Sequence, residues 1–173
     1  MHKKGRKDIP NNFRGISLLS IISKIYTSIL TNRLYSWAEE FGKIGKMQAG
    51  FRKEYSTVDH IFTLTQIVSN CLYGDHRQKV YCIFVDYAKA FNSVKREKLW
   101  EILIKIGVSG KFVRALQAIY KHVYGRVRAG SEMSGAFECP IGLRQGCKMS
   151  PIIFSLLINE VTKALYNEGR PGY

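Results

Sequence analysis

An acidic residue follows an apolar run near the middle of the chain. Residues 80–85 read Val-Tyr-Cys-Ile-Phe-Val, and Asp86 comes directly after them. Because polar residues do not alternate with the apolar ones, the run predicts a strand over 80–86 that is covered on both faces. A carboxylate at the exit of such a strand needs a partner. Two partners fit: the ammonium group of Lys89, or a divalent cation such as Mg²⁺, which binds through few carboxylates plus substrate phosphates.

The charge of the chain indicates what it binds. Its 173 residues include 27 Lys and Arg against 13 Asp and Glu, a formal net charge of +14. A field of that sign favours nucleic acid, although membrane surfaces and plain solubility also explain basic chains. The cations group near the N-terminus and again among later turn signals: Lys3, Lys4, Arg6, Lys7, then Arg126, Arg128, Arg144 and Lys148.

Several classes of protein are disfavoured. The four cysteines form no Cys-x-x-Cys pair, which argues against a zinc site and a disulfide framework and favours inert thiols in a reducing compartment. No run reaches the roughly eighteen apolar residues of a membrane span, and the basic N-terminus lacks the apolar core of a signal peptide. We therefore expect an intracellular protein with no membrane partner.

Apolar residues that recur every three or four positions predict two helices in the first half of the chain. The first runs from Ser20 to about Phe41 and ends at the glycines that follow. The second is capped by Ser56 or Thr57 and stops at Gly74. Four apolar side chains should form its inner face: Ile61, Leu64, Val68 and Leu72.

The second half is predicted to contain three further helices and a hairpin. Helices over 95–106 and 111–122 are separated by Gly-Val-Ser-Gly. Two short strands, in YGRVRAG and GAFECPIGL, are joined by SEMSG into a hairpin. Ser150 and Pro151 start the last helix as cap and first-turn proline. The expected class is mixed α+β, with helices packed on a small antiparallel sheet.

Four sequence blocks, in order and covering nearly the whole chain, resemble reverse transcriptases of non-LTR (LINE-type) retrotransposons. FVDYAKAFNSV is similar to their first catalytic motif, and GLRQGCKMSPIIFSLLINEV to the motif that follows it. KKGRKDIPNNFRGISLLSIISKIYTSILTNRL and QAGFRKEYSTVDHIFTL look like their two finger motifs. The resemblance implies a right-hand polymerase, with a fingers-like region over 1–79 and a partial palm over 80–173 that contains inserted finger helices and the hairpin.

The resemblance also implies an activity: DNA synthesis on an RNA template from a DNA primer, with deoxynucleoside triphosphates as substrates and two metal ions. Asp86, helped by the backbone carbonyl of Tyr87, would bind catalytic Mg²⁺, with Mn²⁺ as a substitute. Phe91 corresponds to the family's steric gate, a ring under the sugar that would clash with a ribose 2′-OH. On spacing alone, Phe91 would instead be a core aromatic in the strand-to-helix turn.

Further positions acquire roles from the same resemblance. Arg14 corresponds to a finger arginine that clamps the triphosphate, and its partner would be Lys3 or Lys4. A solvated basic tail is the alternative for all three residues. Gln145 and Gly146 would lie near the nascent base pair, or form a plain loop-to-helix junction. The template path would be lined by Gln48, Gly50, Phe51 and Arg52. For Arg52, the alternative to a contact with template phosphates is an ordinary surface charge.

One family feature is missing from these residues. The second catalytic block, typically aromatic-Ala-Asp-Asp on a β-hairpin, has no counterpart, since the sequence contains no Asp-Asp pair. We therefore expect a fragment that is truncated before that hairpin and inactive alone, because Asp86 by itself cannot hold two ions. Strand 80–85 would then have an uncovered edge. The alternative function is a catalytically inactive, nucleic-acid-binding remnant of a retrotransposon polymerase.

Overall fold

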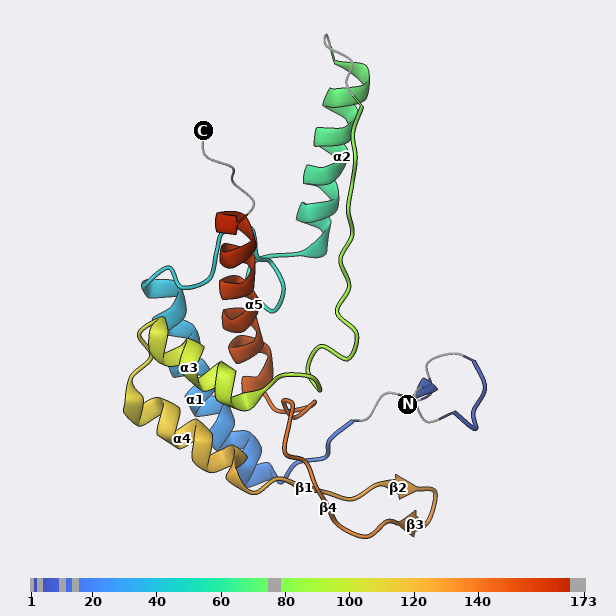
Figure 1. Cartoon of the computed structure of the whole chain (residues 1–173), viewed down its shortest axis with the longest axis vertical. Helices are drawn as coiled ribbons and strands as arrows, with labels where there is room; N and C mark the ends of the chain where they lie inside the picture. Colours follow the sequence, from blue (N-terminus) through green and yellow to red (C-terminus); the bar gives the residue numbers. More distant parts are fainter. Residues whose placement is uncertain (1, 3–4, 10–11, 14–15, 75–78, 169–173) are drawn as a thin grey trace.

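The computed structural model describes residues 2, 5–9, 12–13, 16–74 and 79–168 (Figure 1). In these residues, helices and short strands follow one another in the order α1 (Ile21–Glu40), α2 (Thr57–Tyr73), α3 (Arg96–Lys105), α4 (Gly110–Lys121), β1 (Tyr124–Gly125), β2 (Arg128–Ala129), β3 (Glu132–Met133), β4 (Phe137–Glu138) and α5 (Met149–Glu168). The mixed class is confirmed, and every predicted helix is present. No helix of the described ranges has the length and apolar character that crossing a bilayer requires.

Four helices, α1, α3, α4 and α5, share one apolar core (Figure 1). Its centre consists of side chains with almost no exposed surface: Leu99 and Leu103 of α3, Leu116 of α4, and Ile153 and Leu156 of α5. Each helix therefore presents an apolar stripe at the three- or four-residue spacing that one helix face requires. Helices α1 and α5 pack on each other although they lie on opposite sides of the predicted boundary at residue 79. The division of the chain into two regions stays a prediction.

Helix α1 begins where its sequence predicts. The Ser20 hydroxyl accepts a hydrogen bond from the amide of Ser23 at 3.2 Å, which satisfies one of the free amides of the first turn. Its buried face consists of Thr27, Leu30, Leu34 and Ala38. The isoleucines of its first half do not share that face, and all of them are exposed or half-exposed: Ile21, Ile22, Ile25 and Ile29.

Helix α2 has the predicted bounds but not the predicted packing. Ser56 and Asp59 form a capping box, in which the Asp59 carboxylate accepts from the Ser56 amide at 3.0 Å. Among the described residues, however, α2 packs on no other helix or strand, and it stands away from the four-helix core (Figure 1). The predicted inner face is therefore wrong as a buried face. A periodic apolar pattern indicates which side would be buried but does not supply the element that buries it.

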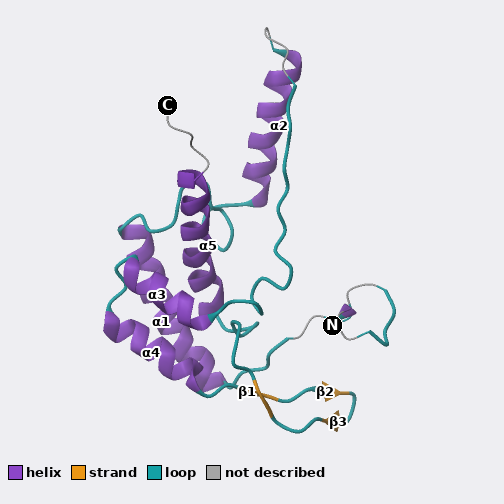
Figure 2. Cartoon of the chain, viewed as in Figure 1, coloured by secondary structure: helices purple, strands orange, loops and turns teal. Residues whose placement is uncertain are grey.

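The predicted strand over 80–86 is wrong in this structure. The segment is irregular (Figure 2) and pairs with no strand of the described residues. Val80 is half-buried, and the side chains of 81–86 are exposed, Ile83 to 89%. A strand exists through its ladder of backbone hydrogen bonds, so an apolar run without a neighbouring strand remains irregular.

The hairpin is confirmed, although its turn is tighter than predicted. Strand β1 pairs with β4 and β2 pairs with β3, both antiparallel, with Tyr124 opposite Glu138. Gly130, at a φ of 63°, sits in the turn between β2 and β3, whereas SEMSG was expected to connect the strands. No helix of the described residues packs on either strand pair, so the prediction of helices packed on a small antiparallel sheet is also wrong. The strands are too short and too exposed to form a core.

Candidate active site

Asp86 is exposed to solvent in the segment that leads from residue 79 to the turn at 88–93. The four ion pairs found among the described residues do not include it. Tyr87, the second expected metal ligand, is about half-exposed. An exposed carboxylate is open to a cation, but within the described ranges no group of three or more His, Cys, Asp or Glu side chains could hold one. The described residues thus fit one ligand of a metal site and not a whole site.

Phe91 lies at the centre of an aromatic stack. Its ring is stacked on that of Phe154 in α5, with centroids 4.6 Å apart and an interplanar angle of 25°. The Phe51 ring meets it edge-on, at 5.9 Å and 85°. Phe91 is half-buried and packs against the core, as the core-aromatic interpretation requires. The stack nevertheless joins three of the four motifs, because each of the rings comes from a different one.

The loop over 142–146 is fastened to the residues that follow Asp86. The Gly142 amide donates to the Val94 carbonyl at 2.9 Å, and the Leu143 amide donates to the Phe91 carbonyl at 2.7 Å. A Cβ on Gly142 would lie 2.8 Å from the carbonyl oxygen of Asn92, and φ there is +82°. Only glycine permits this approach of two backbones. The first catalytic motif and the motif that follows it therefore form one surface.

Gln145 and Gly146 add the first finger motif to that surface. The Gln145 side chain donates to the Asn92 side-chain oxygen at 3.2 Å, and its carbonyl accepts from the Ser17 amide at 3.1 Å. Gly146 has φ +101°, and a Cβ on it would lie 2.7 Å from the Ser17 carbonyl oxygen. The close neighbour of Gly146 is protein backbone, and its predicted place near the nascent base pair stays a prediction. Arg14, Lys3 and Lys4 lie outside the described residues.

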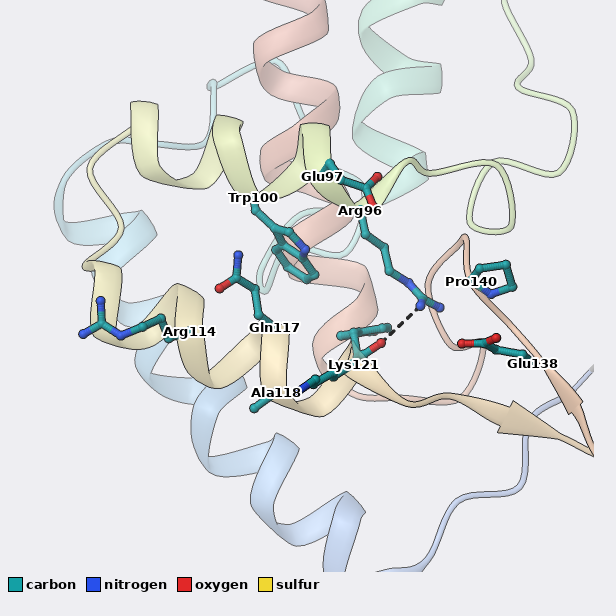
Figure 3. Close-up of a pocket in the computed structure, with 10 residues that line it drawn as sticks. Arg96, Glu97, Trp100, Arg114, Gln117, Ala118, Lys121, Glu138 and Pro140 are labelled. Carbon is teal, nitrogen blue, oxygen red and sulfur yellow. Dashed lines mark hydrogen bonds between the residues drawn. The ribbon is translucent and has the colours of Figure 1, made fainter.

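Behind this loop lies a buried cation that sequence reasoning missed. Arg96 is only 7% exposed, and its guanidinium donates to three carbonyls, those of Gly142 at 2.9 Å, Tyr120 at 3.2 Å and Ile141 at 3.2 Å. Burial lowers the pKa of Arg96. Its stem borders a pocket of about 580 Å³ between α3, α4 and β4 (Figure 3). A lone arginine at a helix start gives no sequence signal that it is buried.

The Tyr120 ring lies between Arg96 and a second guanidinium, that of Arg144. The guanidinium carbons of Arg96 and Arg144 are 5.0 and 5.4 Å from the ring centroid. Arg144 also donates to the Ile119 carbonyl at 2.7 Å, and the Ser150 hydroxyl donates to the Arg144 carbonyl at 2.8 Å. Ser150 thus fastens the loop instead of capping α5, which begins one residue earlier, at Met149. These contacts fix the backbone on which Gln145 and Gly146 sit.

Arg52, expected on the template path, is already engaged within the protein. Its side chain is 10% exposed and forms two hydrogen bonds with the Glu39 carboxylate, at 2.7 and 2.6 Å. A third donor reaches the Gly45 carbonyl at 3.2 Å. The hydrogen bonds from the Arg52 guanidinium lower the pKa of the Glu39 carboxyl. Because the Arg52 guanidinium is mostly buried and paired with Glu39, it stabilises the fold and is not an ordinary surface charge. A contact between Arg52 and the template stays a prediction.

The whole loop over 43–53 is held by side chains from α1 and α5. Asn159 accepts from the Gly45 amide at 2.8 Å and donates to the Lys43 carbonyl at 2.9 Å. The Ser155 hydroxyl donates to the Gly50 carbonyl at 3.4 Å, and the Tyr35 hydroxyl accepts from the Lys53 amide at 2.9 Å. Within this frame Gln48 is half-buried and Gly50 is exposed. Glu39 and Asn159 were missed because each acts on residues distant in the sequence.

Comparison with known proteins places the chain in a family. The family model for reverse transcriptase (RNA-dependent DNA polymerase) matches residues 1–169. Two similar proteins of Drosophila melanogaster are the probable RNA-directed DNA polymerases from transposon BS, 27% identical over 90% of this chain, and from transposon X-element, 27% identical over 93%. The Pol polyprotein from the R2DM element of the same species is 26% identical over 92%.

The matched region is a small part of each relative. The chain spans 17%, 18% and 14% of the lengths of the three proteins, in the same order. The resemblance to non-LTR retrotransposon polymerases, which rested on four ordered motifs, is confirmed, because the family model and the relatives both extend over nearly all of the chain. With its motifs joined in one surface and a family match from residue 1 to residue 169, this chain belongs to the reverse transcriptase (RNA-dependent DNA polymerase) family.

Proposed function

We propose that this chain supplies the fingers and the first part of the palm in an RNA-directed DNA polymerase. The observation that carries the proposal is the convergence on one surface of three motif segments, represented by Phe51, Phe91 and the 142–146 loop. Its partners would be an RNA template, a DNA primer and deoxynucleoside triphosphates, in the nucleus or cytoplasm. The comparisons support a polymerase and give no support to an inactive remnant.

Asp86 would be the first metal ligand, with the carbonyl of Tyr87 beside it. Carboxylate and carbonyl oxygens suit Mg²⁺, and Mn²⁺ accepts the same ligands. Ions held there would supply Lewis-acid chemistry, which would make the primer 3′-hydroxyl more nucleophilic and offset charge on the triphosphate. Since the described residues offer Asp86 no group of three ligands, a complete site needs further carboxylates. The role of this chain is to hold Asp86 next to the nucleotide surface.

The nucleotide would lie against Phe91, Gln145 and Gly146. Phe91 would take the sugar, and Gln145 and Gly146 would lie near the nascent base pair. Arg14 and Lys4 would bind the triphosphate, because a guanidinium fork matches phosphate oxygens and an ammonium adds charge. The formal net charge of +14 favours the same polyanionic ligands.

The template would run along the loop over 43–53, where Gln48, Gly50, Phe51 and Arg52 were predicted to line its path. Phe51 is exposed there and can stack on a base. The hydrogen bonds from Tyr35, Ser155 and Asn159 hold the loop in place for this task. Contacts to template phosphates would set the position of the strand without selecting its sequence.

Primer extension on an RNA template tests the proposal, in a longer polypeptide that continues this chain through the remaining catalytic motifs of the family. Asp86→Asn keeps the shape of the side chain and removes its charge, and it should lower the Mg²⁺-dependent rate by at least about 10²-fold. Asp59→Asn is the matched control, because Asp59 is an exposed cap residue of α2. Wild-type rates in Asp86→Asn would refute the metal role.

A further inference from the structure

The Phe51–Phe91–Phe154 stack joins segments that have different tasks in the proposed polymerase. Phe51 belongs to the predicted template loop, Phe91 is the predicted sugar gate, and Phe154 lies in α5 behind it. The two contacts differ in kind: Phe154 is stacked face to face on Phe91 at 4.6 Å, whereas Phe51 meets the same ring edge-on at 5.9 Å. Two contacts at nearly right angles restrict both the height and the tilt of the Phe91 ring.

The backbone of Phe91 is also fixed. Its carbonyl accepts from the Leu143 amide at 2.7 Å, and the turn that contains it is closed by the Asn92 amide, which donates to the Lys89 carbonyl at 2.8 Å. With the main chain held on both sides, the remaining freedom of Phe91 lies in its side-chain torsions. The neighbouring rings restrict these torsions, so they set where the edge of Phe91 lies.

The backbone of Phe51 is held in a strained conformation. Its φ is +61°, in the left-handed region that residues with a side chain rarely adopt. Such a conformation persists only where the surroundings enforce it. Here the Gly50 carbonyl on one side accepts from Ser155, and Arg52 on the other side pairs with Glu39. Phe51 is nevertheless 60% exposed, so filling the core does not account for its position.

We infer that Phe51 and Phe154 are positioning residues that set the ring of Phe91 and thereby determine how strongly the enzyme rejects ribonucleotides. The inference rests on the proposed function. A gate discriminates by a clash with one hydroxyl group, so a small displacement of the ring changes the clash with the 2′-OH and leaves other contacts of the nucleotide intact. Because Phe51 belongs to the template loop, a shift of that loop would also move the gate.

The test measures kcat/KM for a deoxynucleotide and for the matching ribonucleotide, on one RNA template, in the longer polypeptide described above. The ratio of the two values does not depend on the fraction of folded enzyme or on template affinity, because both substrates are measured on one sample. Phe154→Leu and Phe51→Leu should each lower the ratio by roughly tenfold, the scale on which small changes in a pocket act. Phe154→Tyr and Phe51→Tyr, which keep the rings, should retain it.

Two further variants make the result decisive. Phe91→Val should lower the ratio more than either positioning variant, since it removes the gate itself. Phe112→Leu shortens another half-buried phenylalanine of the core and should leave the ratio unchanged. Since Phe51 is mostly exposed, Phe51→Leu should fold even if Phe154→Leu does not.

Each outcome supports or overturns the inference. If Phe91→Val lowers the ratio while Phe51→Leu and Phe154→Leu leave it at the wild-type value, the positioning role is refuted and the gate stands. If Phe91→Val leaves the ratio unchanged, the gate is refuted and the inference with it, although the polymerase activity that depends on Asp86 stands. An equal fall of the ratio in Phe112→Leu would also overturn the inference, because general loosening of the core would then explain the result.

Discussion

The ion pair between Glu39 and Arg52 gives a prediction whose size and pH dependence both follow from geometry. Glu39→Gln keeps the volume of the side chain and removes the charge that accepts two hydrogen bonds, at 2.7 and 2.6 Å, from Arg52. The two side chains are 10% and 30% exposed, so the pair is neither solvent-screened nor fully buried. Breaking exposed pairs changes stability by up to about 1 kcal/mol and breaking buried pairs by about 3–5 kcal/mol, which places this one near 2 kcal/mol.

The loss should depend on pH in one direction. Arg52 lowers the pKa of the folded-state Glu39 carboxyl below that of the unfolded chain, which is about 4.3. The pair therefore stabilises the folded protein fully above that pH, and the stabilisation disappears as the pH falls through the folded-state pKa. Wild type and Glu39→Gln should differ at pH 7, and the difference should shrink as the pH falls through the lowered folded-state pKa of Glu39.

Thermal unfolding of the 173-residue chain measures this effect. About 2 kcal/mol corresponds to a fall in Tm of roughly 4–8 °C for a chain of this length. Glu40→Gln is the matched control, because Glu40 is exposed and takes part in none of the ion pairs of the described residues. If Glu39→Gln and Glu40→Gln unfold at the same temperature at pH 7, the pair does not hold the loop and our account of the template frame fails.

Three other measurements examine the same surface. Gly142→Ala places a Cβ 2.8 Å from the Asn92 carbonyl oxygen at a φ of +82°, so urea unfolding should show a loss of more than about 1 kcal/mol, whereas Gly135→Ala, with nothing within 4 Å, should lose little. Asn159→Ala removes one bond to the Gly45 amide and one to the Lys43 carbonyl and should lower stability by about 2 kcal/mol; an unchanged urea midpoint would contradict this. Binding of the chain to single-stranded RNA should weaken steeply between 50 and 200 mM salt, because released counterions drive it, and a flat titration would contradict a basic nucleic-acid surface.

The sequence predicted the helices well because their signals are local. A cap such as Ser56 with Asp59, and an apolar residue every three or four positions, act within one or two turns. The predicted bounds of α1 to α4 and the predicted start of α5 agree with the structure within about two residues. The hairpin was predictable for the same reason. The strand over 80–86 and the inner face of α2 were not, since both depend on a neighbour that the pattern cannot supply.

The candidate site shows a similar division. Family motifs identified Phe91, Gln145 and Gly146, and the structure brings these residues together with Phe51. Arg96 and Asn159 were missed, because each is a polar residue whose partners are backbone groups at least 24 positions away. Nothing in the local sequence distinguishes such a residue from one on the surface. Positioning residues of this kind become visible only when the backbone groups they satisfy are seen.

The two halves of the candidate site are held with different firmness. Phe91 and the 142–146 loop are tied to the four-helix core by hydrogen bonds, stacked rings and a buried guanidinium. Asp86 follows an exposed apolar segment without a strand partner in the described residues. Catalysis by positioning requires the carboxylate to be as well placed as the gate, since misplacement by about 1 Å costs up to 10²-fold. Among the described residues, the surface around Phe91 and the 142–146 loop is therefore fixed more firmly than the carboxylate that catalysis would need beside it.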